Sequence, residues 1–564
     1  MDGGSSVAEA LARHDVRFLF TLCGGHISPI LVGAKERGIR VVDVRHEATA
    51  VYAADAVSRL SGVPGVAVVT AGPGLTNSVT AVKNAQLAQS PLVLLGGSAP
   101  TVLKGKGALQ DIDQMALMKP HVKWAESVRK VGDIGPALQK AFAIAQSGVP
   151  GPVFLEFPID VLYPEELVRE WYAAKPGKGL AGKAQDIYLA RHLDAMFADG
   201  GGAGTEEVRI PRHDDKDLAT VFAKLCAAER PVILLGSQAV RPEYADALSD
   251  AVASLGVPVY LSGMARGLLG KEHELLFRHR RKEALKNADL VILAGVPCDF
   301  RLDYGRQLRG YISLNRSRDD LYLNRKPDVA VHADPGGFLL DLAKGCRAHR
   351  KGWLAQLRQN EGEREQEIAA AASEKLAGIN PVAMLRTLDG LLEDDAVLVG
   401  DGGDFVGTAS YTLRPRAPLG WLDPGPFGTL GVGAGFALGA KLCNPGSEVW
   451  VLYGDGACGF SIAEQDTFVR HGLGVISLVG NDGAWNQIAR DQVEYLKDDV
   501  GTQLSQTDYD AVARGFGAQG RRAESLEDFV AGVREAQDSA ANGTPYLLNA
   551  VLGRSDFRKG SVSM

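Results

Sequence analysis

The sequence predicts an α/β protein made of doubly wound parallel sheets, and two observations carry this prediction. Short runs of β-branched and aliphatic residues alternate with helical patterns along the 564 residues, as in parallel sheets that helices cover on both faces. Glycine-containing turns directly follow several of these runs, for example Gly454-Asp455-Gly456 after the run at 449–453. Such folds bind their ligands at the carboxyl ends of the strands, so these turns mark a candidate site.

Three blocks of this pattern follow one another, in line with the usual domain size. The first block, 1–165, contains the predicted strands 18–20, 40–42, 66–69, 92–95 and 153–156. The second block, 205–347, contains the predicted strands 231–235, 290–293 and 329–331. The third block, 378–553, contains the predicted strands 396–399, 449–453 and 475–479. A basic tail at 554–564 follows it.

Two segments of different composition separate the blocks. The glycine-rich stretch 198–204 predicts a flexible connector between the first and second blocks. The stretch 361–376 is rich in Glu and Ala and predicts a helical linker between the second and third.

Composition argues against several classes of protein. The net charge of −7 does not favour nucleic acid as a partner, because that would need a basic face. The six cysteines are scattered and form no C-x-x-C pair, so neither a disulfide framework nor a zinc site is predicted. No apolar run reaches the roughly 18 residues that span a bilayer. We therefore expect no membrane association and a cytoplasmic location.

Two polar turns of the third block predict a magnesium site. Asp455 stands in the turn after one strand, and Asn481-Asp482-Gly483 follows the next. Carboxylate and amide oxygens are ligands that Mg²⁺ prefers, and a glycine turn lets backbone N–H groups approach a phosphate. We predict Asp455, Asn481 and the backbone carbonyl of Gly483 as metal ligands. The diphosphate would lie at the following helix N-terminus, against Gly456, Ala457 and Cys458. Alone, this pattern also fits simple tight turns.

Four more segments of the chain strengthen this interpretation. Glu47 lies where the predicted strand at 41–44 meets a helix, and Ala71-Gly72-Pro73-Gly74-Leu75-Thr76-Asn77 follows. The others are Gly107-Ala108-Leu109-Gln110 and the glycine-rich run 426–433. Together with the magnesium motif, in this order, they resemble the thiamine-diphosphate (ThDP) enzymes of the acetolactate synthase, oxalyl-CoA decarboxylase and 2-hydroxyacyl-CoA lyase group. The resemblance covers nearly the whole chain.

The resemblance implies roles at the cofactor. It places Glu47 against N1′ of the aminopyrimidine, where a carboxyl group favours the imino tautomer. Alone, Glu47 would be an ordinary helix N-terminal acid. Gly428 would accept from the 4′-amino group and Leu430 would hold the two rings in a bent conformation. Further phosphate contacts are expected from another turn after a strand: Gly402, Gly403 and Asp404.

The resemblance also implies the organisation of the molecule. The first block would bind the pyrimidine, the second would be nucleotide-binding-like, and the third would bind the diphosphate and Mg²⁺. Because Glu47 and the metal ligands lie in different blocks, one chain is not expected to complete its own site. The family solution is a two-fold dimer with two shared sites, usually paired into a tetramer.

The motifs that bear on the substrate are less specific than those for the cofactor. Acetolactate synthases carry a tryptophan after the metal segment where this chain has Ile488, whereas Met264-Ala265-Arg266-Gly267 looks like a turn of the CoA-using members. Overall, the chain most resembles the acetolactate-synthase-like branch of 2-hydroxyacyl-CoA lyases. Candidate contacts to an acyl-CoA are Arg266, Arg414, Arg416, Trp485 and, in a tail that closes as a lid, Arg558. Each arginine fits a merely solvated side chain equally well, and the tail a frayed terminus.

The implied reaction cleaves the C1–C2 bond of a 2-hydroxyacyl-CoA to formyl-CoA and an aldehyde or ketone, with ThDP as the electron sink. His26 and Glu494 are candidates for handling the hydroxyl proton, and Gln110 for a hydrogen bond to the reacting group. His26 could also cap a helix, and Glu494 could be a solvated helical acid. The cluster Arg278-His279-Arg280-Arg281 predicts a nucleotide in the second block, as ADP in the CoA-using relatives or FAD in acetolactate synthase.

Three alternatives stay open at this point. One is an acetolactate synthase with FAD, which would form acetolactate from pyruvate. Another is a decarboxylase that releases CO₂ from oxalyl-CoA. The third is a noncatalytic subunit with the ThDP-enzyme fold, which the intact Glu47 and metal motif do not favour.

Overall fold

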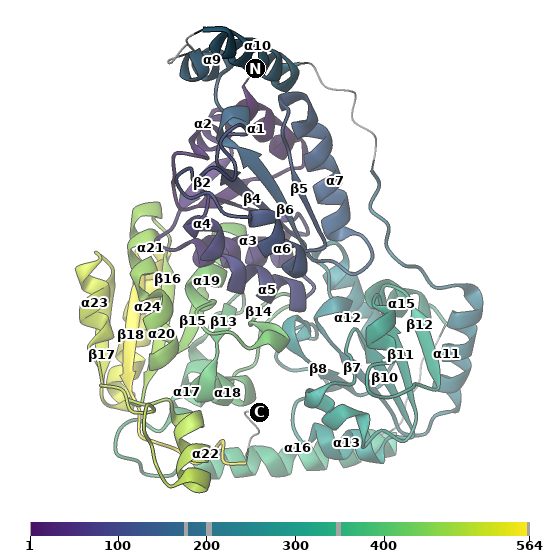
Figure 1. The fold of residues 1–564 in the computed structure, drawn as a ribbon. Helices are drawn as coiled ribbons and strands as arrows, with labels where there is room; N and C mark the ends of the chain where they lie inside the picture. Colours follow the sequence, from purple (N-terminus) through teal and green to yellow (C-terminus); the bar gives the residue numbers. More distant parts are fainter. Residues whose placement is uncertain (1, 174–178, 199–205, 346–350, 561–564) are drawn as a thin grey trace. The chain divides into compact units, whose positions relative to one another are not determined.

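A computed structural model describes residues 2–173, 179–198, 206–345 and 351–560. Most of the predicted connector at 198–204 and the last four residues of the tail lie outside these ranges. The chain divides into two compact units, Met1–Arg209 and Ile210–Met564. Three parallel six-stranded sheets, one in the first unit and two in the second, confirm the predicted α/β class (Figure 1).

The first unit holds one sheet, with strand order β2-β1-β3-β4-β6-β5. Its strands are β1 (Phe18–Thr21), β2 (Arg40–Asp43), β3 (Gly65–Val69), β4 (Leu92–Ser98), β5 (Trp124–Ser127) and β6 (Pro152–Pro158). Its helices are α1 (Gly3–Arg13), α2 (Ser28–Glu36), α3 (Glu47–Ser61), α4 (Pro73–Thr76), α5 (Val79–Leu87), α6 (Gln114–Met118), α7 (Ile134–Gln146), α8 (Ile159–Leu162), α9 (Glu165–Ala173) and α10 (Gly179–Phe197).

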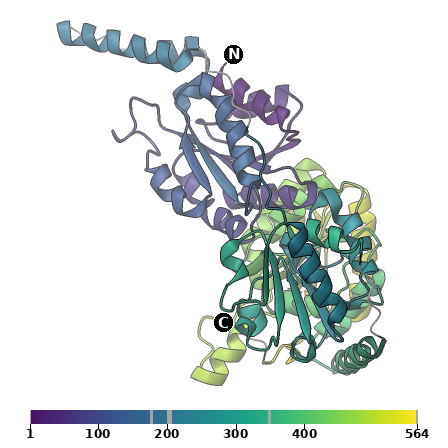
Figure 2. The ribbon, with the colours of Figure 1, turned by 90° about the vertical axis from the view of Figure 1, so that its right-hand side faces the viewer.

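The sequence predicted five of the six strands of this unit, including the partly exposed β2 at one edge of the sheet. Every residue of β3, β4 and β6 is buried, and apart from Glu156 and Ser98 these strands are runs of apolar residues and glycine, as expected for parallel strands covered on both faces. Strand β5 lies at the edge of the sheet, is half-buried throughout and was not predicted. Helices α1, α2 and α7 contribute to one hydrophobic core beside this sheet, which Leu193 and Met196 near the end of α10 join. The rest of α10 projects away from the sheet (Figure 2).

The second unit holds two sheets. The central sheet, in the order β12-β11-β10-β7-β8-β9, consists of β7 (Pro231–Leu235), β8 (Val259–Leu261), β9 (Leu276–Phe277), β10 (Leu290–Ala294), β11 (Tyr311–Asn315) and β12 (Val329–His332). The C-terminal sheet, in the order β14-β13-β15-β16-β18-β17, consists of β13 (Val397–Asp401), β14 (Trp421–Leu422), β15 (Val449–Gly454), β16 (Val475–Asn481), β17 (Gln519–Ala523) and β18 (Tyr546–Val551).

Helices cover both sheets of the second unit. Those of the central sheet are α11 (Asp215–Ala227), α12 (Ala245–Ser254), α13 (Arg281–Asn287), α14 (Arg318–Leu321) and α15 (Pro335–Leu342). Those of the C-terminal sheet are α17 (Pro381–Leu391), α18 (Gly403–Thr412), α19 (Gly433–Cys443), α20 (Asp455–Ser461), α21 (Gln465–His471), α22 (Asn486–Leu496), α23 (Tyr509–Gly515) and α24 (Leu526–Ala541).

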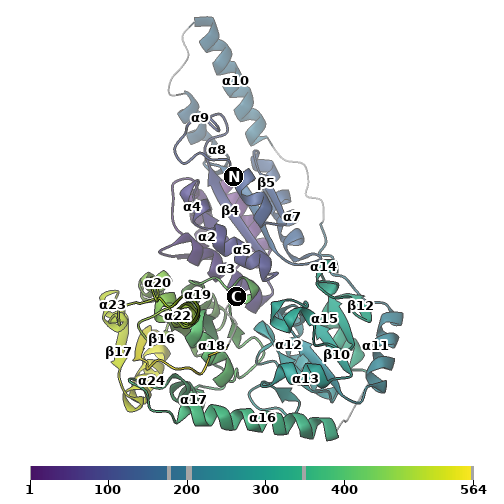
Figure 3. The same cartoon turned by 60° about the horizontal axis from the view of Figure 1, so that its bottom comes forward.

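A single long helix connects the two sheets of this unit (Figure 3). Helix α16 spans Lys351–Ala372, so it begins ten residues before the predicted linker at 361–376. Its start was missed because Trp353 and Leu357 are buried against the central domain and do not have the composition of a linker. The Trp353 indole Nε1 donates to the carbonyl of Pro231 at 3.1 Å, which fixes the helix to the start of β7.

Strand order places the candidate sites. In the first sheet, β1 lies between β2 and β3, and in the C-terminal sheet, β13 lies between β14 and β15. At these two points consecutive strands run to opposite sides, which opens a crevice at the strands' carboxyl ends. Glu47 follows β2 at the first of these points, and Gly402 and Asp455 follow β13 and β15 at the second, while Asn481 ends the neighbouring strand β16. Among the described residues, no helix is both long and apolar enough to cross a membrane.

Candidate active site

The carboxyl group of Glu47 lies in a protected position in the first unit. Glu47 is the first residue of α3, and the side chain of His46 caps this helix by accepting from the amide of Ala48 at 3.1 Å. Only 5% of Glu47 is exposed. The Asn77 side-chain Nδ2 donates to its Oε2 at 3.0 Å. A solvated helix N-terminal acid would be exposed, so this burial argues against that alternative.

The turn after β3 packs directly on Glu47. Gly72 adopts φ +60° and ψ −107°, a conformation that favours glycine. A Cβ on Gly74 would lie 2.9 Å from the methyl group of Thr70 and 3.6 Å from Oε1 of Glu47. The turn therefore approaches the carboxylate closely, and Asn77, at its end, provides the hydrogen bond.

His26 and Gln110 lie around the same turn. His26 Nδ1 is 3.2 Å from the Thr70 hydroxyl, and burial lowers the pKa of the imidazole, which favours its neutral form. This contact is not the helix cap that the sequence also allowed, since α2 has no side-chain cap. Gln110 adopts φ +61°, and a Cβ on Gly72 would lie 2.7 Å from its carbonyl oxygen.

The predicted magnesium ligands come together in the second unit. Asp455 is the first residue of α20, directly after β15, and Asn481 is the last residue of β16. The two strands pair in parallel with Gly454 opposite Gly480, so their ends are adjacent. Both side chains are buried, with Asp455 3% and Asn481 0% exposed.

Each of these two side chains buries one oxygen without a partner. Within the described part of the chain, Oδ2 of Asp455 and Oδ1 of Asn481 have no hydrogen-bond partner. The Asn481 amide is oriented because Nδ2 donates to the carbonyl of Thr507 at 3.0 Å and to Oδ1 of Asn549 at 3.1 Å. Buried polar atoms without partners are rare, and a hard divalent cation would satisfy both oxygens. The donor set therefore fits Mg²⁺.

The rest of the loop is compatible with this interpretation. Gly483 adopts φ +66°, and its carbonyl accepts from the amide of Leu504 at 2.8 Å. A carbonyl oxygen has a second lone pair for a metal. Burial raises the pKa of Asp455, and burial together with the Asp455 charge raises the pKa of Asp482 to about 7.

The turn between β15 and α20 is shaped by Trp485. A Cβ on Gly456 would lie 2.3 Å from the Trp485 ring, so the indole packs against the predicted diphosphate turn. Asp455 Oδ1 accepts from the Gly456 amide at 2.8 Å. Ala457 and Cys458, both buried, continue the first turn of α20. Trp485 thus has a packing role in addition to its predicted contact to substrate.

The predicted pyrimidine segment is fixed to the end of β13. The carboxylate of Asp401 accepts from the amides of Gly431 and Gly433 at 2.9 and 2.8 Å. The side chain of Leu430 lies against Gly402, where a Cβ would come within 2.3 Å of it. Gly428 adopts φ +63° and faces open space. Asp401 was not predicted, although it directly precedes the predicted Gly402-Gly403-Asp404 turn.

The side chain of Asp404 does not suit the expected contact to a phosphate. Arg490 donates to its carboxylate at 2.8 Å, and both side chains are largely buried. A carboxylate repels a phosphate, so a contact from Asp404 would have to come from its backbone amide. The ion pair connects α18 to α22, the helix that follows the metal loop.

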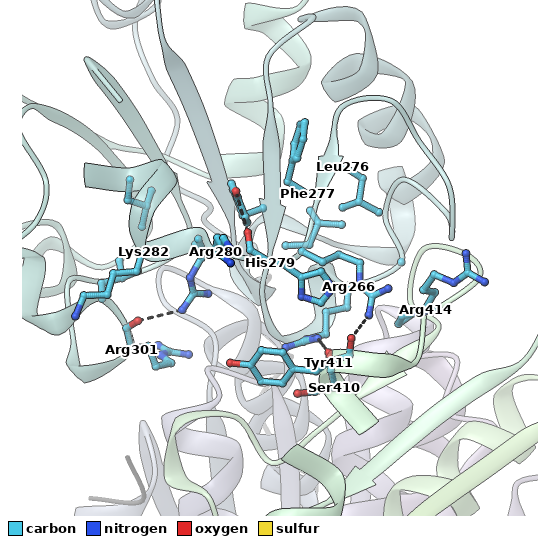
Figure 4. A pocket seen from close by; sticks show the side chains of 18 of the residues that line it. Arg266, Leu276, Phe277, His279, Arg280, Lys282, Arg301, Ser410, Tyr411 and Arg414 are labelled. Atoms are coloured by element: carbon cyan, nitrogen blue, oxygen red, sulfur yellow. Dashed lines mark hydrogen bonds between the residues drawn. The ribbon is translucent and has the colours of Figure 1, made fainter. Parts of the chain in front are cut away.

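A strongly basic cavity of about 380 Å³ lies between the central sheet and the C-terminal end of α18 (Figure 4). One acidic side chain, Asp303, lines it, against the basic side chains Arg266, Lys271, Arg278, Arg280, Arg281, Lys282, Arg301 and Arg414. Burial lowers the pKa of Arg266, Arg278 and Arg281. An anionic ligand would offset the cost of burying these charges.

Two of these arginines already bind the backbone of the C-terminal domain. Arg266 donates to the carbonyl of Ser410 at 2.9 Å, and Arg278 donates to the carbonyls of Tyr411 and Leu413. Nε of Arg266 is buried without a partner among the described residues. Other lining cations are paired with carboxylates outside the lining, namely Arg280 with Glu367, Arg301 with Asp299 and Arg414 with Asp389. Nε of Arg266 is therefore a donor that remains for a ligand.

The other predicted CoA contacts lie elsewhere. Arg416 is buried and bound to Asp389 at 3.0 Å, outside the residues that line the cavity, so its contacts give no support to a role in CoA binding. Arg414 lines the cavity, although the same Asp389 carboxylate binds it at 2.7 Å. Arg558 stacks on Tyr411 at 5.0 Å and lines a separate small cavity with Asp404 and Asp482. Glu494 is exposed on α22, which does not distinguish a catalytic acid from a solvated one.

Comparison with known proteins identifies the domains of the chain. Three family models match the chain, described as the N-terminal, central and C-terminal domains of thiamine pyrophosphate enzymes. They cover residues 1–117, 218–342 and 401–550. The first and last contain Glu47 and the predicted metal ligands, respectively.

Full-length relatives are more specific. The chain is 53% identical to 2-hydroxyacyl-CoA lyase 2 of Danio rerio, over all of this chain and 93% of that protein. It is 51% identical to 2-hydroxyacyl-CoA lyase 2 of Homo sapiens, over all of this chain and 92% of that protein. An acetolactate synthase large subunit of Mycobacterium tuberculosis is 35% identical over 98% of this chain and 96% of its own length. The chain belongs to the thiamine pyrophosphate enzyme family.

Proposed function

We propose that this protein is a ThDP- and Mg²⁺-dependent 2-hydroxyacyl-CoA lyase that releases formyl-CoA and an aldehyde or ketone. The observation that carries the proposal is identity of about 50% to proteins named 2-hydroxyacyl-CoA lyase 2, over the whole chain. In the reaction the C1–C2 bond breaks, the C2 hydroxyl loses its proton, and C1 gains a proton. The bonds therefore balance without an oxidant or a reductant.

The cofactor would be held by residues of both units. Asp455, Asn481 and the carbonyl of Gly483 would bind Mg²⁺, and the amides of Ala457 and Cys458 the diphosphate. Glu47, Gly428 and Leu430 would hold the pyrimidine. When bound, ThDP supplies the electron sink that C–C bond cleavage requires.

Proton handling is assigned to residues around this cofactor. Glu47, buried and held by Asn77, would share a proton with N1′ of the pyrimidine. His26, with its pKa lowered by burial, is a neutral base for the substrate hydroxyl, and Glu494 is the second candidate. Gln110 would orient the reacting group by a hydrogen bond.

The basic cavity suits the nucleotide part of an anionic ligand. Eight basic side chains and the aromatic ring of Tyr411 surround it, and arginine forks match phosphate geometry. CoA and a resident ADP both contain an adenosine phosphate. We therefore assign the cavity to the binding of an adenosine phosphate group, with Arg266 and Arg414 as candidate contacts. The proposed assembly is a homodimer or homotetramer with shared active sites, in the cytoplasm.

The deciding experiment offers the protein, with ThDP and Mg²⁺, a series of 2-hydroxyacyl-CoAs, oxalyl-CoA and pyruvate in parallel, with products identified by mass spectrometry. We expect formyl-CoA and the matching carbonyl compound from the 2-hydroxyacyl-CoAs, and little acetolactate from pyruvate. The second candidate is a carboligase, favoured by the 35% identity to an acetolactate synthase subunit. Efficient acetolactate formation without formyl-CoA would overturn the lyase proposal, and release of CO₂ from oxalyl-CoA alone would indicate a decarboxylase.

A further inference from the structure

A buried polar cluster lies beneath the pyrimidine half of the site. It is centred on Gln114, the first residue of α6, and Glu156 of β6, which are 1% and 0% exposed. Neither residue is among the proposed contacts to cofactor or substrate. Burying an amide and a carboxylate costs free energy unless both are fully hydrogen-bonded, so the cluster needs a structural or functional explanation.

The Gln114 amide uses its atoms in one orientation only. Its Oε1 accepts from the amide of Gly72 at 2.9 Å. Its Nε2 donates to the carbonyl of Gly97 at 3.0 Å and to Oε2 of Glu156 at 2.9 Å. The side chain therefore connects the turn after β3 to the end of β4, and a rotated amide would lose these contacts.

Glu156 supports this orientation from below. Its Oε1 accepts from the Ser127 hydroxyl at 2.8 Å and is paired with Lys104. The lysine balances the buried charge, and Oε2 is left to hold Nε2 of Gln114. The carboxylate thus selects which end of the amide faces Gly72.

The two glycines whose backbone groups Gln114 binds lie against candidate catalytic residues. Gly72 packs on Gln110 and begins the turn that ends at Asn77, the hydrogen-bond donor to Glu47. Gly97 packs on His26, where a Cβ would come within 2.6 Å of that of His26. A displacement of Gly72 or Gly97 would therefore move groups placed around the pyrimidine.

We propose that Gln114 and Glu156 are positioning residues for Glu47, His26 and Gln110, and that they set the rate of the chemical step rather than the affinity for the acyl-CoA. This rests on the proposed function, since it requires those three groups to act at the cofactor. Misplacement of reacting groups by about 1 Å can cost about 10²-fold in rate. Loss of Gln114 would allow such a shift without removing any group that touches the reactants.

The test compares Gln114→Met, Gln114→Glu and the exchanged pair Gln114→Glu/Glu156→Gln. Methionine keeps the shape but not the hydrogen bonds. Glutamate replaces the donor with a negatively charged oxygen, which is repelled by the Glu156 carboxylate and by the Gly97 carbonyl oxygen. The exchanged pair restores a donor opposite an acceptor. Gln359→Met, at an exposed position of α16, is the control.

We expect Gln114→Met to lower kcat about 10²-fold, with KM for the acyl-CoA changed less than about threefold. Gln114→Glu should be slower still, and the exchanged pair should recover about tenfold or more of that loss, as expected for directly coupled residues. Affinity of the apoprotein for ThDP with Mg²⁺, by titration calorimetry, should fall in the same order, since Gly72 begins the turn that holds Glu47.

Two further measurements keep the outcomes distinct. Ser127→Ala removes one donor to Glu156 without adding a charge, and a fall in its kcat supports the proposal if Gln114→Glu does not fold. Glu47→Gln is assayed alongside. If Glu47→Gln is inactive but Gln114→Met keeps more than half of the wild-type kcat, or the exchange brings no recovery, the positioning role is wrong. If Glu47→Gln itself stays active, the proposed cofactor site fails instead.

Discussion

The unpartnered oxygens of Asp455 and Asn481 are the most direct residue-level support for a bound cation. Each is buried, and each belongs to a side chain whose other polar atom is already bound. The arrangement is therefore preformed: Asn549 and Thr507 fix the Asn481 amide so that its oxygen is left for a ligand. Outer partners of this kind orient metal ligands and tune their affinity.

This geometry predicts a graded loss of cofactor binding. Asn549→Ala frees the Asn481 amide to rotate and should weaken binding of ThDP with Mg²⁺ by about 10–100-fold, as for other outer partners of metal ligands. Asp455→Ala removes a ligand outright and should weaken binding further. Calorimetric titration of the apoprotein measures both. Activity should also disappear on treatment with a chelator and return with Mg²⁺ and ThDP.

The control for this prediction is Asp538→Asn, at an exposed position of α24, which should bind the cofactor normally. An Asp455→Ala protein with wild-type affinity would place the metal elsewhere. Equal losses in Asp455→Ala and Asn549→Ala would also contradict the assignment of ligand and outer partner.

Sequence reasoning at this scale worked where a polar residue directly follows a strand. Asp455 and Asn481 were found this way because the carboxyl ends of parallel strands share one edge of a sheet. It failed where the partner is distant in the chain. No local sequence pattern shows that Arg416 forms an ion pair with Asp389, or that Gln114 accepts a hydrogen bond from Gly72, because the tertiary fold creates these contacts.

At the scale of elements, apolar runs predicted many of the strands, including β2 and β12 at sheet edges, but missed others, among them the buried strands β11 and β18. Strand β5 mixes polar and apolar residues, and β9 and β14 have two residues each, too short for a periodic signal. The start of α16 was missed because its buried face belongs to the central domain. A hydrophobic pattern reports burial, so very short strands, strands of mixed polarity and helix faces buried between domains give weak signals.

The C-terminal tail is an element whose packing suggests a role. Phe557 and Arg558 both contact Tyr411. The ring centres of Phe557 and Tyr411 are 6.3 Å apart, and the Arg558 guanidinium lies 5.0 Å from the centre of the Tyr411 ring. Arg364 of α16 lies over the ring of Phe557 at 5.4 Å. Tyr411 also lines the basic cavity. The tail is therefore attached to one wall of the cavity through a shared aromatic ring.

We predict that removing the residues after Gly553 will raise KM for the acyl-CoA, about tenfold, with a smaller effect on kcat, because a cation–π contact of this kind contributes about 0.5–2 kcal/mol. Arg558→Ala should give part of the effect. Lys559→Ala removes the same charge from an exposed neighbour and should change little. A tail deletion that lowers kcat and leaves KM unchanged would assign the tail to the chemistry instead.

At the scale of the whole molecule, the alternating pattern was enough to predict three parallel sheets. It did not predict how the sheets cooperate, because the candidate groups come from different units of the chain. Glu47 lies in the unit Met1–Arg209 and the metal ligands lie in the unit Ile210–Met564. The proposal of active sites shared between two subunits is the part that no local pattern tests.

Subunit complementation tests that proposal directly. Glu47→Gln and Asp455→Ala should each be inactive alone. A heterodimer of the two, isolated with a different tag on each chain, should regain about half of the wild-type activity, because a two-fold arrangement places intact Glu47 and intact Asp455 in one of its two sites. If each chain completed its own site, every site in the heterodimer would carry one defect and activity would stay absent. A heterodimer as inactive as its parents, although stable and able to bind ThDP, would therefore contradict the shared site.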